Sequence, residues 1–335
     1  ARLIVVDPRR TELAAMAAAY LQVRPGANVP LFNALACVLV EEGLIDRGFI
    51  AGRVAGWEDY EPFIRAQTPE RWEAVTGVPA HRVREAARLY GRASRPFMAH
   101  GLGVTEHYQG SESVMLLCNL ALLAGAVGRP GVGINPLRGQ NNVQGSADMG
   151  CQPDLLTGYA RVDDPAVRAR FESAWGRPVP ETPGRRLPEM LDAARSGAIR
   201  GLFILGEDIV QTDPDTGRTR AALAALEFLV VQELFLSETA KLAHVVLPGA
   251  SFLEKDGTFT NGERRIQRVR RVLGPPGEAR ADWEILTALM AASGCPQSAR
   301  SPEEIMVEIA RVAAPFAGVS YPRLEGDGLQ WPVPD

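Results

Sequence analysis

The sequence predicts an α/β protein with two parallel α/β units and a small β-hairpin excursion. Two observations carry this prediction. Apolar runs of strand length, Leu3–Val6 near the start and Gly201–Leu205 in the second half, each lead into a helical pattern, as buried parallel strands do. Between these regions lies a long stretch, Gly128–Gly150, that is dense in glycine, asparagine and glutamine. Strands that alternate with helices on both sides of such a loop indicate two successive α/β units.

Length and composition set the broad class. The 335 residues suffice for about two domains, and 46% hydrophobic and 23% charged residues are ordinary for a soluble globular protein. The net charge of −4 gives no reason to expect nucleic acid or an anionic membrane as a partner. The apolar run Val114–Val127 is interrupted by Asn119 and Gly125 and is too short to span a bilayer. We therefore expect no direct membrane insertion and a cytoplasmic location.

Cysteine and histidine show no metal-ligand spacing. The chain has 4 cysteines without a CxxC pair, and its 4 histidines lie apart in the sequence. We therefore predict no metal ligands and no iron–sulfur cluster built within these residues. Cys37 and Cys118 fall in apolar helical patterns and are interpreted as small core side chains.

In the first half, strands and helices alternate. Asp7 follows the first strand, at the carboxyl end where ligands bind in open α/β sheets and where an acid commonly holds a ribose or a base edge. A helix N-terminal acid that complements the helix dipole is an equally good interpretation from spacing alone. The further elements expected are a helix over Thr11–Leu21, a short strand and turn over Val23–Asn28, helices over Pro30–Glu42 and Ala80–Ala93 with short helices between them, a strand over Phe97–His100 and a buried helix over Glu112–Val127.

The second half restarts the pattern after an irregular, proline-rich stretch, Cys151–Pro188. The Asn261-Gly262 pair marks a hairpin within Phe252–Val272. Five arginines between positions 264 and 271 are either a solvated face or a contact with cofactor phosphates or another subunit. The regular elements expected are helices over Leu187–Ser196, Thr219–Leu226, Asp282–Ala292 and Pro302–Val312, and strands over Gly201–Leu205, Phe228–Gln232 and His244–Leu247.

The central loop sets one guanidinium, Arg138, among several side-chain amides. Glycine and asparagine let the backbone turn tightly and approach a ligand closely. Amides offer donors and acceptors without charge, and arginine offers a planar fork that matches a carboxylate or a phosphate. A plain surface loop is the other interpretation of this composition.

The loop residues Asn135–Gly150 read NPLRGQNNVQGSADMG, and this string resembles the molybdopterin oxidoreductase superfamily and, within it, the catalytic (alpha) subunits of formate dehydrogenases. The departures are Ser146 and Ala147, where alanine and cysteine are usual in that family. Six further segments resemble the same family in the same order, namely VVDPRRTEL, LQVRPG, GLGVTEH, GEDIVQTDPD, HVVLPGASFLEKDGTFTNGERRIQ and GEARADWEI.

The resemblance implies two Rossmann-like units that hold a molybdenum or tungsten ion through two molybdopterin guanine dinucleotides (bis-MGD). It also implies an internal fragment, inactive alone, without the upstream segment that carries a 4Fe–4S cluster and the metal-ligating cysteine or selenocysteine. The division expected is a first, partial dinucleotide-binding domain (1–137), a second one (138–251), a hairpin excursion toward an iron–sulfur domain (252–275), helices returning to the second domain (276–325) and a linker to a cap domain (326–335).

Site residues follow from the resemblance position by position. Lys255 is chemically reasonable near a pterin or pyrophosphate because it favours negative charge, whereas outside the FLEKDG context it would be an exposed turn lysine. Asn28 stands where aspartate is common in the family. The implied cofactor contacts are Asp7, Pro8, Gly26 and Asn28 for one guanosine, Leu102 and Glu106 on the pterin side, and Asp208, Gln232, Glu233, Lys255 and Asp282 for the second dinucleotide.

The resemblance implies that Arg138 binds the substrate, formate. A bidentate arginine holds both carboxylate oxygens and directs the C–H bond, and Gln140 could hold a pterin or orient the substrate. The expected reaction is molybdenum-dependent oxidation of formate to carbon dioxide. Electrons would leave through iron–sulfur clusters on other domains or subunits to an acceptor that could be NAD-linked.

Three other functions are weighed against this one. Another reductase of the superfamily, such as an assimilatory nitrate reductase, shares the scaffold, but RGQNNVQG favours formate. A non-catalytic homologue like the large subunit of respiratory complex I need not keep Arg138 and its amides. A plain dinucleotide-binding dehydrogenase requires a glycine fingerprint at the start of a βαβ unit, which this sequence does not show.

Overall fold

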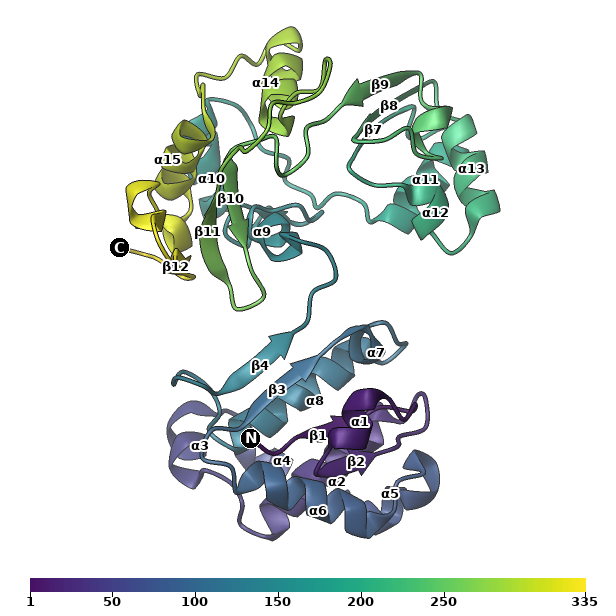
Figure 1. Cartoon of the computed structure of the whole chain (residues 1–335), viewed down its shortest axis with the longest axis vertical. Coiled ribbons are helices and arrows are strands. Elements are labelled where there is room, and N and C mark those ends of the chain that lie inside the picture. Colours follow the sequence, from purple (N-terminus) through teal and green to yellow (C-terminus); the bar gives the residue numbers. More distant parts are fainter. The chain divides into compact units, whose positions relative to one another are not determined.

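Two units make up the fold, Ala1–Arg138 and Gly139–Asp335, in a computed structural model that describes residues 1–335 (Figure 1). The first unit combines two small sheets with a set of helices. Its elements are β1 (Ile4–Val6), α1 (Glu12–Met16), β2 (Ala19–Leu21), α2 (Asn28–Glu41), α3 (Arg47–Arg53), α4 (Trp57–Arg65), α5 (Pro69–Thr76), α6 (Ala80–Gly91), β3 (Phe97–His100), α7 (Leu102–Thr105), α8 (Gly110–Leu123) and β4 (Gly133–Pro136).

Strands β1 and β2 are parallel, with Ile4 opposite Ala19. The prediction of one helix over Thr11–Leu21 is therefore wrong beyond Met16, where α1 ends. Ala19 and Leu21 are buried and Tyr20 between them is half-buried, so this segment follows the two-residue period of a strand. The predicted second strand thus lies before position 23 rather than after it.

The predicted strand over Phe97–His100 is confirmed as β3, and its partner comes from the central loop. Strand β4 runs parallel to β3, with Phe97 opposite Gly133 and His100 opposite Pro136. The sequence Gly-Ile-Asn-Pro lacks a strand pattern, so only the pairing of its backbone with β3 shows that it is extended. Pairing with β3 therefore holds the central loop in place just before Arg138.

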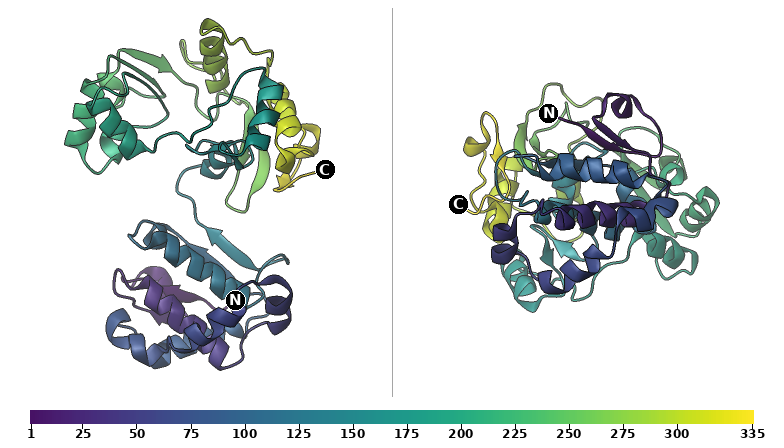
Figure 2. Two further views of the ribbon diagram at one scale, coloured as in Figure 1. Left: turned by 180° about the vertical axis from the view of Figure 1, so that it is seen from behind. Right: turned by 90° about the horizontal axis from the view of Figure 1, so that it is seen from below.

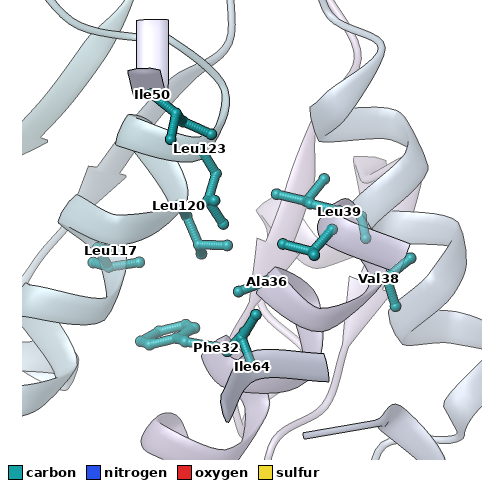
Figure 3. Packing of buried hydrophobic residues seen from close by; sticks show 11 residues of the cluster. Phe32, Ala36, Val38, Leu39, Ile50, Ile64, Leu117, Leu120 and Leu123 are labelled. Carbon is teal, nitrogen blue, oxygen red and sulfur yellow. The ribbon is translucent and has the colours of Figure 1, made fainter. Parts of the chain in front are cut away.

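Helix α2 is the central helix of the first unit. Its buried side chains cover most of its circumference, and they pack against α8, α4 and α6. Figure 3 shows Phe32 and Leu39 of α2 together with Leu120 of α8 in this core. Helix α8 was predicted to be buried nearly all round, but Met115 is 57% exposed, so one face of α8 is open. Cys118 is likewise exposed and is not the core side chain expected, whereas Cys37 is buried as predicted.

The second unit contains two hydrophobic cores. Its elements are α9 (Val143–Asp148), β5 (Leu155–Leu156), β6 (Ala160–Arg161), α10 (Pro165–Trp175), α11 (Leu187–Arg195), β7 (Gly201–Leu205), α12 (Ile209–Thr212), α13 (Thr216–Ala224), β8 (Phe228–Glu233), η1 (Ala240–Leu242), β9 (Val245–Pro248), β10 (Gly257–Thr260), β11 (Arg265–Val269), α14 (Asp282–Ala292), α15 (Pro302–Val312), η2 (Ala314–Phe316), η3 (Pro322–Leu324) and β12 (Leu329–Gln330).

The first of these cores lies under a parallel sheet in the order β7-β8-β9. Leu229 and Val231 of β8 are fully buried against the helices that follow and precede the strands, among them Leu191 of α11 and Leu223 of α13. The strands predicted in this region are confirmed, and their parallel pairing confirms the α/β class. The carboxyl ends of all three strands therefore meet at one edge of the sheet.

The second core joins an antiparallel sheet to α10 and α15. The predicted hairpin is confirmed, with Gly257 of β10 opposite Val269 of β11. Strand β12, near the C-terminus, adds to β11 at its other edge. The left view of Figure 2 shows the yellow C-terminal segment beside the green hairpin.

Helix α10 lies inside the stretch predicted to be irregular. It has regular end signals, because the carboxylate of Asp164 caps its first turn and Gly176 adopts a left-handed conformation at its end. The predicted helices over Asp282–Ala292 and Pro302–Val312 are confirmed as α14 and α15. No helix of the chain has both the length and the apolar character needed to cross a membrane.

Candidate functional site

The first group of predicted cofactor residues lies at the carboxyl edge of β1 and β2. Asp7 follows β1 directly, its backbone N–H donates to the carbonyl of Leu21 at 3.3 Å, and its carboxylate accepts from the backbone N–H of Arg9 at 2.7 Å. Pro8 next to it is exposed. The cap of α1 is Thr11 and the acid in its first turn is Glu12, so the alternative interpretation of Asp7 as the helix N-terminal acid is wrong. The Asp7 carboxylate is half-buried at a strand end, where a ligand can reach it.

The same edge continues through the turn after β2. Gly26 has a φ of +85°, and the space where a Cβ would sit is open. Asn28 begins α2, and its amide nitrogen donates to the carbonyl of Gly103 at 3.3 Å. This bond links α2 to α7, whose first residue, Leu102, is 56% exposed. Glu106 is exposed just after α7. The structure thus connects Asn28, through Gly103, 75 positions further along the sequence, to the segment that carries the two predicted pterin-side residues.

Three predicted residues of the second group converge on one another. Gln232, at the carboxyl end of β8, is 1% exposed, and its amide nitrogen donates to Asp282 Oδ1 at 2.7 Å. Lys255 forms an ion pair with the other oxygen of Asp282. The side-chain oxygen of Gln232 is buried and accepts no hydrogen bond from the protein. A buried amide with an unsatisfied acceptor is suited to a ligand that carries an N–H donor.

Asp208 and Glu233 belong to the same sheet edge but are engaged locally. The carboxylate of Asp208 accepts from Thr239 Oγ1 at 2.6 Å and from the backbone N–H groups of Thr239 and Glu238 at 3.0 and 3.3 Å. Partial burial opposes ionisation of Asp208, but these hydrogen bonds prevail and hold its pKa below the usual value. Glu233 Oε1 accepts from the backbone N–H of Leu234 at 2.6 Å. Asp208 is therefore a fixed anion at the end of β7.

Arg138 and Gln140, the predicted substrate residues, are both exposed. Arg138 is the last residue of the first unit and Gln140 lies in the second. The backbone N–H of Leu137 donates to the carbonyl of His100 at 2.7 Å, which continues the pairing of β4 with β3 up to Arg138. Burial, aided by the positive charge of Arg138, lowers the pKa of His100. The imidazole next to the predicted substrate arginine is therefore held neutral at pH 7, a feature that the sequence analysis did not identify.

The sequence analysis also missed a buried polar cluster in the second unit. Asp148, the last residue of α9, is fully buried, and its Oδ1 accepts from Tyr159 OH at 2.7 Å and from Gln144 Nε2 at 2.9 Å. A nitrogen of Arg264 lies 3.3 Å from the same oxygen, and the guanidinium carbon lies 3.3 Å from the centre of the Trp331 ring. A carboxylate near the end of the amide-rich central loop was the only sequence signal for this cluster.

The arginine run between 264 and 271 is therefore not a single solvated face. Arg264 pairs with the buried Asp148, and Arg268, whose side chain is 13% exposed, stacks over Tyr321 with its guanidinium carbon 3.9 Å from the ring centre. Arg265 and Arg270 pair with acidic side chains at the surface. Two of the five arginines thus point inward and bind the second unit together.

An apolar hollow of about 170 Å³ lies elsewhere, between α3, α4 and α8 of the first unit. Trp57 and Tyr60 line it, and burial raises the pKa of Tyr60 to about 12. None of the predicted site residues takes part in it. The chain also contains no group of three or more histidine, cysteine, aspartate or glutamate side chains arranged to hold a metal ion.

The chain is 44% identical to the F420-dependent formate dehydrogenase subunit alpha of Methanocaldococcus jannaschii, an alignment that covers 100% of this chain and 50% of the relative. It is 40% identical to formate dehydrogenase H of Escherichia coli, covering 100% of this chain and 47% of that protein. The chain thus spans about half the length of these curated relatives.

A solved structure of acetylene hydratase from Pelobacter acetylenicus has the same fold, with a TM-score of 0.76 and 19% sequence identity over 99% of this chain and 48% of the other. The family model for molybdopterin oxidoreductases matches residues 1–292. This match covers both sheet edges and the segment that carries Arg138 and Gln140. The chain is therefore homologous to formate dehydrogenase alpha subunits and belongs to the molybdopterin oxidoreductase family.

Proposed function

We propose that the complete protein containing this chain is a formate dehydrogenase that oxidises formate to carbon dioxide. The observation that carries the proposal is Arg138, an exposed guanidinium just after the anchored strand β4, which Gln140 follows closely in the sequence. The names of the relatives, formate dehydrogenases of Methanocaldococcus jannaschii, Methanococcus maripaludis and Escherichia coli, support the same substrate.

We also propose that the two sheet edges each hold one molybdopterin guanine dinucleotide. In the first unit, Asp7, Pro8, Gly26 and Asn28 would hold a guanosine, with Leu102 and Glu106 on the pterin side. In the second unit, the unsatisfied buried oxygen of Gln232 fits a purine or pterin edge, because such an edge carries N–H donors. The residues that would complete this second site are Asp208, Glu233, Lys255 and Asp282.

Iron–sulfur clusters and an electron acceptor are the further partners in this proposal, together with a metal bound by the two pterins. The cofactor, when bound, would take up the two electrons that formate loses. The cytoplasmic location stays a prediction.

The residues of this chain would bind and orient formate. Oxidation of formate yields carbon dioxide, a proton and two electrons, so the substrate must be held with its C–H bond exposed to the acceptor. The guanidinium of Arg138 can donate two parallel hydrogen bonds to the two carboxylate oxygens, which fixes the carbon between them. The amide of Gln140 can donate a further hydrogen bond from the side. A neutral His100 adds no second cation, so the positive charge that attracts the anion stays on Arg138.

The test is the kinetics of Arg138→Lys and Arg138→Ala in the complete, cofactor-loaded protein, with formate and an artificial electron-accepting dye. Because lysine keeps the charge but cannot form the bidentate pair, both substitutions should lower kcat/KM by about 10²- to 10³-fold. The matched control is Arg53→Lys, since Arg53 is exposed at the end of α3 and away from the proposed site.

Two results would contradict the proposal. Wild-type protein that reduces nitrate but does not oxidise formate would indicate another reductase of the family. An Arg138→Ala variant with unchanged kcat/KM for formate would show that this arginine does not bind the substrate.

A further inference from the structure

Residues 138–142 carry the two proposed substrate residues. Hydrogen bonds hold the chain just before this segment within the first unit and at its last residue within the second unit. On the side of the first unit, β4 and the bond from Leu137 N–H to the carbonyl of His100, 2.7 Å long, fix the chain just before Arg138. On the side of the second unit, the side-chain oxygen of Asn142 accepts from the backbone N–H of Thr260 at 2.9 Å. Asn142 lies only two residues beyond Gln140, so this bond fixes where the segment ends.

Helix α9, which Asn142 precedes, is too short to define its own position. It has only 6 residues, and an isolated helix needs roughly 12 to 15 to be marginally stable in water. Its position comes from the hairpin β10–β11 instead. Asn142 is bonded to the last residue of β10 at the start of α9, and Asp148 is bonded to Arg264 of the hairpin turn at its end. The hairpin therefore holds α9 at both ends.

The geometry at Asn142 leaves little choice of residue. Asn142 adopts a left-handed conformation with φ of +61°, which asparagine tolerates better than most residues. A Cβ on Gly145 would lie 2.1 Å from Asn142 Oδ1, so a glycine at 145 is what lets the amide reach Thr260. The other two non-glycine residues with positive φ are Tyr159 and Arg264, both in contact with Asp148. Non-glycine residues keep a positive φ only where the surrounding structure determines their conformation. Here all three such residues lie around one short helix, α9.

A purely stabilising purpose does not account for this arrangement. A largely buried ion pair such as Asp148–Arg264, in which the carboxylate is fully buried and the guanidinium partly so, is on average no more stabilising than apolar side chains of the same size. Its best-attested use is to select one arrangement among several. Here the Asp148–Arg264 pair fixes the position of α9, and Gln140 lies just before this helix. We infer that Asn142, backed by the Asp148–Arg264 pair, is a positioning residue that sets the placement of Gln140 for formate.

This inference rests on the proposed function and is tested in the complete, cofactor-loaded protein. Asn142→Gly keeps the left-handed backbone but removes the acceptor for Thr260, whereas Asn142→Asp keeps both. Asn142→Gly should lower kcat/KM for formate by about ten- to a hundredfold, mainly through a higher KM, because Gln140 loses its fixed geometry. Asn142→Asp should recover most of it. Ser146→Ala, on the exposed side of the same helix, is the matched control and should change kcat/KM less than twofold, or about 0.4 kcal/mol at most.

Two readouts separate positioning from mere folding. Backbone hydrogen exchange at Thr260 should become faster in Asn142→Gly and stay unchanged in Ser146→Ala, whatever the activity. In a double-mutant cycle with Gln140→Ala, the loss from Asn142→Gly should largely disappear, because an amide that is absent cannot be mispositioned.

The outcomes are distinct for the two proposals. The inference alone would be overturned if the wild-type protein oxidises formate and Asn142→Gly leaves KM unchanged. It would equally be overturned if the losses from Asn142→Gly and Gln140→Ala simply add. A wild-type protein that does not oxidise formate would overturn the proposed function and with it the role of Asn142 toward formate. This would hold even if hydrogen exchange at Thr260 still showed the bond between Asn142 and Thr260.

Discussion

Removing the cation from the buried cluster should destabilise the second unit, and Arg264→Met is the substitution that does so. Methionine can follow the aliphatic part of the arginine but leaves the fully buried carboxylate of Asp148 without its ion-pair partner. Loss of one member of a buried pair costs about 3–5 kcal/mol, and loss of a guanidinium stacked on an aromatic ring costs about 0.5–2 kcal/mol.

The structure places the expected loss of stability at the lower end of the range for buried ion pairs. Asp148 keeps its hydrogen bonds from Tyr159 and Gln144, and 34% of the Arg264 side chain is exposed, so solvent can partly replace it. We therefore expect a loss of about 3 kcal/mol. For a unit of this size that corresponds to a decrease of about 6–12 °C in Tm.

Urea unfolding followed by circular dichroism, with thermal unfolding alongside, measures the loss. Arg271→Met is the matched control, because Arg271 belongs to the same run but is exposed, and it should change stability by less than about 0.5 kcal/mol. The double variant Asp148→Asn/Arg264→Met should lose less than the sum of the single variants, since the neutral amide no longer needs a cation. A loss below about 1 kcal/mol, or strict additivity, would refute the reasoning about the pair.

Two further predictions concern the segment around Arg138. Gly145→Ala should destabilise the chain by about 1–3 kcal/mol in urea unfolding, because its Cβ would fall 2.1 Å from Asn142 Oδ1. Gly139→Ala is the control and should be close to neutral, because nothing lies within 4 Å of the Cβ that it would add. Equal losses of stability in the two variants would contradict the contact. Burial lowers the pKa of His100 below its ordinary 6.5, so its contribution to stability is present above about pH 6.5 and is lost as the pH falls toward the folded-state pKa. Urea unfolding between pH 5 and 8 should show this decline, and His100→Gln should flatten it; an identical pH profile in the variant would speak against the titration of His100.

Local sequence signals sufficed for the elements whose side chains define them. Helices α14 and α15 and strands β3 and β7 were predicted at their observed bounds, because apolar periodicity and helix-start residues such as the capping Ser301 act within a few residues. The family, the α/β class and the hairpin followed from the same one-dimensional information. In Ala14–Leu21 the many alanines give no clear period, so the pattern predicts one continuous helix although β2 occupies Ala19–Leu21.

Tertiary structure decided what depends on distant partners. Strand β4 exists because its backbone pairs with β3, and backbone pairing leaves little trace in the residues Gly133–Pro136. The convergence of Gln232 and Lys255 on Asp282, and of Asp148 on Arg264, joins positions 27 to 116 residues apart. A charge run in sequence does not reveal which guanidinium will find a buried carboxylate, because that choice is made only when two separately formed elements pack together and the desolvated charge must be compensated.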